Sequence, residues 1–218
     1  MIASDFLDKR LLRVYISSTL MDMQDERNYL TTRVFPALIQ YCKERLVSFF
    51  PIDLRWGITD EEARLNKELE IVLREIINAK PFFIGILGES YGWIPSEAQR
   101  MAMAENTFIF HDFPWIEGEL LKGTSVTEIE MQEAAFRSEE KMHAYFYLRS
   151  SKMETPKEFT EKEGSHRAEK LMALKKKIRE QKRYPAKEYD SVEHLGELVE
   201  NDFKALINEL FPLPALSS

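Results

Sequence analysis

The sequence lacks several features that would place it in a familiar class of protein. It contains one cysteine, Cys42, which excludes an internal disulfide framework and any zinc site built from several cysteines. Nine prolines and eight glycines in 218 residues are too few for a collagen-like or low-complexity chain. No apolar run approaches the roughly 20 residues of a membrane-spanning helix, and charges interrupt the stretch 1–13 where a signal peptide would need an apolar centre. We therefore expect a cytoplasmic protein.

Positive charge is also scarce relative to negative charge. The formal net charge is −7 and the sequence pI is about 5.3, which argues against partners such as nucleic acid or an anionic membrane. The basic run 175–183 is accordingly read as a solvated helix face. Hydrophobic residues make up 44% and charged residues 31%, which is typical of a folded globular domain.

The motifs of several common enzyme classes are missing. There is no GxGxxG, no GxxxxGK[ST] and no GxSxG, which argues against a Rossmann dehydrogenase, a P-loop NTPase and a serine hydrolase. The histidines have no HxxxH or HExxH spacing, so we predict no metal site and no resident cofactor. These histidines are His111, His143, His166 and His194.

What the chain does contain is an alternation of apolar, strand-like segments with amphipathic helical ones. The segments expected as strands are 11–17, 47–54, 81–88, 143–148 and the less apolar 184–189. Pro51 suggests an edge position for the second strand, and the unbroken apolar run 81–88 suggests the centre of the sheet. Strands that alternate with helices predict one doubly wound α/β domain with a parallel sheet and helices on both faces.

The helical segments are marked by apolar spacing and by capping residues. A long helix is expected over 22–44, with a kink or a break at Pro36. Capping-box spacing at Thr59 and Glu62 predicts a second helix, and further helices are expected over 96–105, from Ser125, and over 191–210. We expect residues 1–212 to form a single domain with an insertion at about 96–122. Residues 213–218 would lead towards a downstream NTPase domain.

In a sheet of this kind the ligand crevice lies at the carboxyl ends of the strands. This rule points to four segments that follow strands or open a helix. They are 17–19, 55–59, 88–93 and the region around Ser125.

Glu130 is the strongest catalytic candidate. On a helical wheel it falls between Val126 and Ala134, on the apolar side, where a carboxylate is costly unless it is paired or functional. A cap, a salt bridge or a rim position would also explain it. Glu128 falls on the opposite side of the helix and has capping-box spacing from Ser125; it is the second candidate.

Other polar and aromatic residues at these strand ends are candidate ligand-binding residues. Arg55 and Trp56 would clamp a phosphate and stack on a ring, or would belong to an ordinary loop with Trp56 folded onto the core. Ser17 and Ser18 would donate to a ligand or cap the next helix. The remaining candidates, which equally suit a cavity wall or a helix cap, are Tyr91, Trp93 and Ser125.

Several sequence blocks resemble a known family. The chain is similar to a TIR-like domain family of undetermined function found at the N-terminus of NACHT and other STAND-type NTPases, with relatives in nephrocystin and the telomerase-associated vault protein. The blocks that carry the resemblance are RVYISSTLMDMQDERNYL (13–30), VFPAL (34–38), DLRWGIT (53–59), PFFIGILGESYGWIP (81–95) and TSVTEIE (124–130).

This resemblance implies a flavodoxin-like sheet of about five parallel strands. It also implies either self-association through homotypic TIR-like contacts or cleavage of the glycosidic bond of NAD, in a signalling or defence effector. Glu130 corresponds to the essential TIR glutamate, Ser17 and Ser18 to the loop after the first strand, and residues 55–59 to the loop after the second.

Two functional hypotheses follow, from different classes. The first is an NAD glycohydrolase (NADase), with NAD as its substrate. The second is a non-catalytic signalling module that associates with itself or with a partner and transmits the state of an attached NTPase. For the second, the aromatic residues of the insertion would form an apolar contact surface or would equally belong to the core; they are Phe108, Phe110, Phe113 and Trp115.

Overall fold

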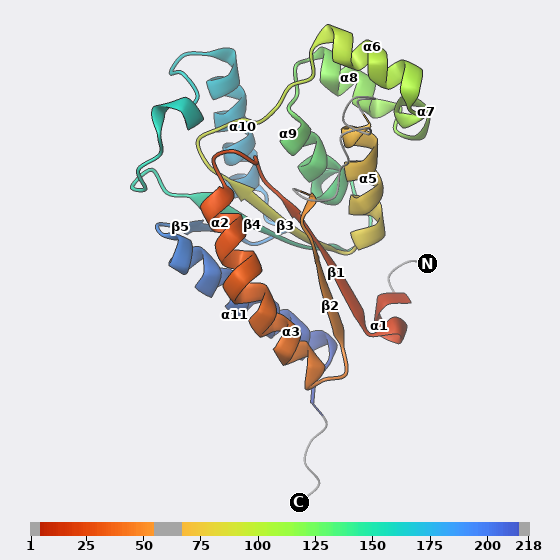
Figure 1. The fold of residues 1–218 in the computed structure, drawn as a ribbon, viewed down its shortest axis with the longest axis vertical. Helices are drawn as coiled ribbons and strands as arrows, with labels where there is room; N and C mark the ends of the chain where they lie inside the picture. Colours follow the sequence, from red (N-terminus) through yellow and green to blue (C-terminus); the bar gives the residue numbers. More distant parts are fainter. Residues whose placement is uncertain (1–4, 55–66, 214–218) are drawn as a thin grey trace, which may run out of the picture.

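The five apolar segments form one parallel sheet in the computed structural model, which describes residues 5–54 and 67–213 (Figure 1). All four strand pairings are parallel. The strands are β1 (Leu11–Ser17), β2 (Ser48–Ile52), β3 (Phe82–Leu87), β4 (His143–Arg149) and β5 (Ala186–Tyr189).

The order of the strands in the sheet is β2-β1-β3-β4-β5. This is the flavodoxin-like order, in which successive strands are added to one side of β1 and then to the other, so that the strand order reverses between β1 and β3. The predicted α/β doubly wound fold is confirmed. The predicted central strand is confirmed as well, since every residue of β3 is buried. β2, which carries Pro51, lies at one edge, where a residue without a backbone N–H is tolerated.

Helices cover both faces of the sheet because its strands alternate apolar side chains to either side. One face packs α5 (Glu68–Ala79), α9 (Val126–Met131) and α10 (His166–Glu180) against Tyr15 and Phe83. The other face packs α3 (Phe35–Lys43) and α11 (Val192–Leu210) against the neighbouring Val14 and Phe82 (Figure 1).

The long helix expected over 22–44 is divided into three parts. α2 (Gln24–Tyr29) passes into a π-helical turn, Leu30–Val34, and α3 follows with Pro36 in its first turn. Proline is tolerated there because the first N–H groups of a helix have no intrahelical partner. The expected kink or break at Pro36 therefore takes the form of a π-turn before it, and Val34 and Phe35 at the junction keep right-handed helical dihedral angles.

The insertion contains more helix than the sequence predicted. The helix expected over 96–105 is α6 (Glu97–Asn106), and Ser96 caps it through a capping box with Gln99. Two short helices then follow, α7 (Ile109–Asp112) and α8 (Trp115–Leu121), and together with α6 they form a lobe beside α5 and α9 (Figure 1). A short helix, α1 (Asp5–Lys9), precedes β1, and a further π-turn, Gln132–Phe136, continues α9.

None of the helices in the described residues has both the length and the apolar character needed to cross a membrane.

Candidate functional site

A cavity of about 700 Å³ lies at the point where the strand order reverses between β1 and β3. Its wall is formed by the end of β1 and the segment after it, by α5, by the segment after β3 and by α9. This volume is of the size that takes a cofactor or a drug-sized ligand. The cavity lies in the region to which the strand rule pointed.

α9 brings the main candidate, Glu130, to this cavity. The helix begins after Ser125, whose side chain accepts a hydrogen bond from the backbone N–H of Glu128 at 3.3 Å. The backbone N–H of Val126 donates to the carbonyl of Trp93 at 2.9 Å, which fixes the start of α9 against the segment after β3. Ser125 is therefore a helix cap and is fully buried.

The carboxyl group of Glu130 is almost completely enclosed. Glu130 is 7% exposed and lines the cavity. Burial raises the pKa of Glu130 to about 7, against the opposing effects of the Ser17 hydroxyl, the Arg27 guanidinium and the Tyr15 hydroxyl. A carboxyl group with this pKa exists in both protonation states near neutral pH, which suits proton transfer or stabilisation of a developing positive charge.

Glu128 points away from the cavity and has a structural role. It accepts a hydrogen bond from the Tyr91 hydroxyl at 2.5 Å and another from the Gln132 amide at 3.4 Å. The carboxylate of Glu128 and burial together raise the pKa of Tyr91. Tyr91 is 0% exposed and does not line the cavity, so its ring is not available to stack on a ligand.

The segment after β1 is held in place by Arg27 of α2. The guanidinium donates to the Ser18 hydroxyl and to the Asp53 carboxylate, each at 2.6 Å. It also reaches the backbone carbonyls of Ile16 and Ser18 at 3.3 Å. Ser18 lines the cavity and donates its own hydroxyl to the Thr19 carbonyl at 2.7 Å, so the Ser18 hydroxyl is engaged within the protein.

Four polar atoms at this site are buried and make no hydrogen bond within the described residues. They are Ser17 Oγ, Thr19 Oγ1, Asp22 Oδ2 and Glu68 Oε2. Thr19, Asp22 and Glu68 line the cavity, and Ser17 lies beside the carboxyl group of Glu130 without completing a hydrogen bond of regular geometry. These atoms have almost no accessible surface. The Ser17 hydroxyl acts on the carboxyl group of Glu130 and the Thr19 hydroxyl on that of Asp22, so both hydroxyls are packed within the wall of the cavity.

The segment after β3 supplies the aromatic wall. Trp93 lines the cavity with 39% of its surface exposed, which leaves ring surface for stacking. Gly92 precedes it with φ of +95°, and a Cβ there would lie 2.7 Å from Thr127 Oγ1 and 3.2 Å from Thr19 Cγ2. Only glycine allows the chain to pass this closely between the segment after β1 and α9.

The structure thus brings Ser18, Trp93 and Glu130 to one cavity, with Ser17 beside them. It places Ser125, Glu128 and Tyr91 in supporting positions. The predicted ligand-binding residues Arg55 and Trp56, and the helix start at Thr59, lie outside the described residues.

Several lining residues were missed in the sequence. They are Asp22, Arg27, Glu68 and Arg167. Arg27 carried a usable signal, because it lies four residues after Met23 and three before Leu30, on the apolar stripe of its helix. Arg167, from α10, reaches the same cavity and donates to the Gly92 carbonyl at 2.8 Å. Nothing local in the sequence connects it to β3.

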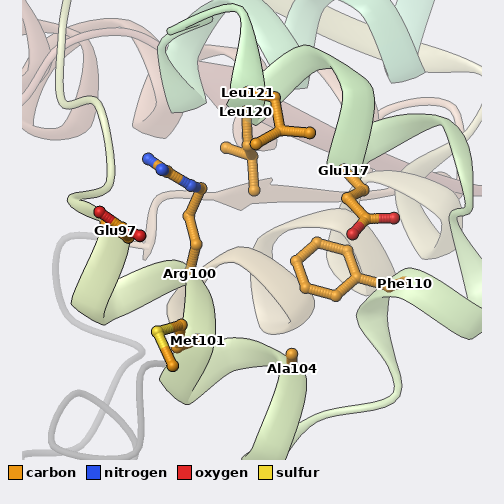
Figure 2. A pocket seen from close by; sticks show the side chains of 8 residues that line it. All are labelled: Glu97, Arg100, Met101, Ala104, Phe110, Glu117, Leu120 and Leu121. Atoms are coloured by element: carbon orange, nitrogen blue, oxygen red, sulfur yellow. The ribbon is translucent and has the colours of Figure 1, made fainter.

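A second, smaller hollow of about 240 Å³ lies within the insertion, between α6 and α8 (Figure 2). Figure 2 shows the side chains of Arg100, Phe110 and Leu120 around it. Of the aromatic residues expected to form a contact surface, Phe113 is buried, and Phe110 and Trp115 pack against the core. Phe108 is 72% exposed, so that expectation holds for this residue alone.

Metal binding has no support in residues 5–54 and 67–213, where no three His, Cys, Asp or Glu side chains are grouped to hold an ion. Cys42 is buried in the core, and burial raises the pKa of its thiol to about 11.

Comparison with known proteins supports the family part of the resemblance. The chain is 32% identical over 222 residues to telomerase protein component 1 of Mus musculus, a match that covers 92% of this chain and 8% of that protein. It is 30% identical to tetratricopeptide repeat protein 41 of Rattus norvegicus, over 93% of this chain and 18% of that protein. It is 31% identical to the human NACHT and WD repeat domain-containing protein 2, over 64% of this chain and 8% of that protein.

The chain therefore spans less than a fifth of the length of these curated relatives. No solved structure matches it. A family model described as "Domain of unknown function (DUF4062)" matches residues 13–204, which takes in β2 to β5, β1 from its third residue, and every described residue that lines the cavity. The chain belongs to this DUF4062 family, whose members include NACHT-containing proteins.

Proposed function

We propose that this chain is a signalling or effector domain that hydrolyses the N-glycosidic bond of NAD in the cavity between β1 and β3. The observation that carries the proposal is the carboxyl group of Glu130, which is buried against a ligand-sized cavity and has a pKa of about 7. Perturbed carboxyl groups in clefts are concentrated at catalytic sites. The resemblance to TIR-like domains supplies the substrate.

The chemistry needs little beyond one carboxylate. The bond between the ribose C1′ and the nicotinamide nitrogen breaks, and its electron pair leaves with the nicotinamide, which becomes neutral. The ribosyl carbon passes through an oxocarbenium-like state that the carboxylate of Glu130 stabilises. A water oxygen then bonds to C1′, and its proton passes to Glu130 and on to solvent. The products are nicotinamide, ADP-ribose and one proton.

Other cavity residues have positioning roles in this proposal. Trp93 offers ring surface for stacking. Arg27 holds the segment after β1 through the Ser18 hydroxyl and the segment after β2 through the Asp53 carboxylate, and so fixes the part of the cavity wall that lies beside Glu130.

The attached NTPase and self-association belong to the same proposal. Two relatives are named NACHT and WD repeat domain-containing protein 2, which supports a linkage of this domain to an NTPase. We expect activity to require self-association, as implied by the likeness to TIR domains.

The second candidate function is a non-catalytic module that transmits the state of such an NTPase by contact. It is favoured by the exposed apolar side chains of the insertion, Met101, Phe108 and Leu121. If this candidate is right, the protein associates in a concentration-dependent manner and leaves NAD intact.

The deciding experiment measures NAD and its products by chromatography. Purified protein, crowded or fused to an oligomerising domain, should release nicotinamide and ADP-ribose. Glu130→Gln, which keeps the side-chain volume, should lower kcat by roughly 10²-fold or more. Glu209→Gln is the matched control, because Glu209 is an exposed glutamate of α11, on the other face of the sheet. Intact NAD under conditions in which a known TIR enzyme consumes it would rule the proposal out.

A further inference from the structure

The segment after β3 that carries Trp93 has no regular secondary structure. Residues 90–96 lie between the end of β3 and the start of α6, and Ser90, Gly92 and Trp93 among them line the cavity. In a strand or a helix the backbone hydrogen bonds of the element itself would fix the path of the chain. In this segment, groups from other parts of the fold have to do so.

Glu161, in the connection between β4 and α10, supplies two of these groups. Its backbone N–H donates to the carbonyl of Glu89 at 3.0 Å, and its carboxylate accepts a hydrogen bond from the backbone N–H of Tyr91 at 2.8 Å. The side chain of Glu161 is 13% exposed. A carboxylate is a stronger acceptor than a neutral group, so this contact fixes the backbone at Tyr91.

Arg167, in the first turn of α10, joins Glu161 to the next residue of the segment. Its guanidinium donates to both carboxylate oxygens of Glu161, at 2.8 and 2.9 Å, and to the carbonyl of Gly92 at 2.8 Å. Burial opposes the ionisation of Glu161, but the Arg167 guanidinium and the Tyr91 N–H outweigh it and lower the pKa of this carboxyl group. The fork of a guanidinium meets a carboxylate through two N–H groups at once, which a lysine ammonium does not reproduce.

The backbone at Trp93 is therefore held on both sides. Arg167 holds the carbonyl of Gly92 directly before it, and the N–H of Val126, at the start of α9, donates to the carbonyl of Trp93 itself at 2.9 Å. α9 also carries Glu130. Because the Trp93 ring is partly exposed, its position relative to the Glu130 carboxyl group depends on these backbone contacts more than that of a buried ring would.

We infer that Glu161 and Arg167 are positioning residues, which hold the Trp93 ring in place for a ligand through the backbone before it. The stacking of a nicotinamide ring on Trp93 rests on the proposed function. The hold on Trp93 rests on the hydrogen bonds described above. A wall that is fixed before the ligand arrives loses less conformational entropy on binding, and so binds more tightly.

Fluorine NMR of the 218-residue chain labelled with fluorotryptophan follows the Trp93 ring without any ligand. The chain has three tryptophans, and the resonance that is lost in Trp93→Phe belongs to Trp93. Arg167→Met and Glu161→Gln should each move this resonance towards the chemical shift of free fluorotryptophan, because a ring that samples several orientations loses its fixed surroundings. Arg167→Lys keeps the charge without the fork and should move the resonance by less.

Arg179→Met is the matched control. Arg179 lies on the same helix and also pairs with a glutamate, at 2.7 Å, but that glutamate is Glu188 of β5. This variant should leave the Trp93 resonance where it is in the unmodified protein. Thermal melts of all variants show that each is folded at the temperature of the NMR measurement.

The consequence for binding is measured by calorimetric titration with carbocyclic NAD. In this analogue a methylene replaces the ring oxygen of the ribose that carries the nicotinamide, so that the bond to the ring is not hydrolysed. Arg167→Met and Glu161→Gln should each weaken binding by about threefold or more, since the ligand then has to order the wall. Arg179→Met should bind the analogue as the unmodified protein does.

Two outcomes overturn the inference. If the Trp93 resonance is unchanged in both Arg167→Met and Glu161→Gln, neither residue holds the ring, and any loss of affinity in Arg167→Met comes from a direct contact with the ligand. If the resonance moves and the affinity does not, the ring is held but its place does not matter to the ligand. If the unmodified protein does not bind the analogue, the proposed function falls, and the Trp93 resonance alone decides whether Glu161 and Arg167 hold the ring.

Discussion

At the scale of single residues, the two glutamates of α9 show that the direction of a side chain decides whether it has a supporting role or lines the cavity. Glu128 and Glu130 are two positions apart, which turns their side chains to nearly opposite sides of a helix. Glu128 reaches Tyr91 and Gln132, while Glu130 faces the cavity. The helical wheel predicted this difference from sequence. It could not predict the burial that sets the pKa of Glu130, since burial depends on the segment after β1 and on β3.

The same burial makes a prediction about stability that does not depend on catalysis. The pKa of Glu130 is about 7 in the folded protein and about 4.5 when exposed, so the folded state binds more protons between these values. The free energy of unfolding should therefore fall as pH rises from 4.5 through 7. Glu130→Gln stays neutral throughout, and at pH 8.5 it should be more stable than the unmodified protein by about 3 kcal/mol.

Urea unfolding at pH 5 and pH 8.5 checks this prediction. The two proteins should differ little at pH 5, where Glu130 is protonated in the folded state. A variant that is equally stable or less stable at pH 8.5 would show that the carboxyl group is not held in the enclosed environment described above.

At the scale of elements, α2 and the segments that flank the cavity show which charges periodicity can reveal. Glu26 and Arg27 both lie on the stripe that begins at Met23 and continues through Leu30, and both are buried. Two charged residues on the apolar stripe of a helix indicate that the helix packs against polar or charged groups elsewhere in the fold. The partners, Asp53 after β2 and Arg149 at the end of β4, come from distant parts of the chain, and periodicity carries no information about them.

The segment after β3 gives the prediction at this scale. Gly92→Ala would place a Cβ 2.7 Å from Thr127 Oγ1 at a φ of +95°, and should lower the free energy of unfolding by about 2 kcal/mol. Gly118→Ala is the matched control, because Gly118 lies inside α8 with nothing within 4 Å of an added Cβ. That change should stabilise the protein by roughly 0.5–1 kcal/mol.

Urea unfolding of both variants at one pH measures the comparison. Equal effects, or stabilisation by Gly92→Ala, would mean that the contact between the segment after β3 and α9 is looser than the structure shows.

At the scale of the whole molecule, long and regular patterns were predictable and short ones were not. The five strands were located from apolar runs, the cap at Ser125 was predicted from its spacing to Glu128, and helices were expected to start at about Ser96 and Ser191, because these are local signals. α7 and α8 have four and seven residues, too few turns to establish a period, and their place in the fold was missed. The cavity gathers residues from Tyr15 to Arg167, and only the tertiary fold brings them together.

The buried ion pair between Glu26 of α2 and Arg149 at the end of β4 gives the last prediction. Arg149, at the end of β4, donates through Nε to Glu26 of α2 at 2.9 Å, and the Tyr189 hydroxyl of β5 donates to the same carboxylate at 3.1 Å. Arg149→Met would leave the Glu26 carboxylate buried without its cation. The free energy of unfolding should fall by about 3–5 kcal/mol.

The double variant Glu26→Met with Arg149→Met shows whether the pair or the unpaired charge matters. Two apolar side chains of similar volume remove both charges, so the double variant should be more stable than Arg149→Met alone. The exposed pair Lys176–Glu180 on α10 provides the control, and Lys176→Met should change the free energy of unfolding by less than about 0.5 kcal/mol. Urea unfolding of the four proteins measures these differences. If the double variant were the least stable, the pair itself would be holding α2 to β4 and β5, and the cost would not lie in the stranded carboxylate.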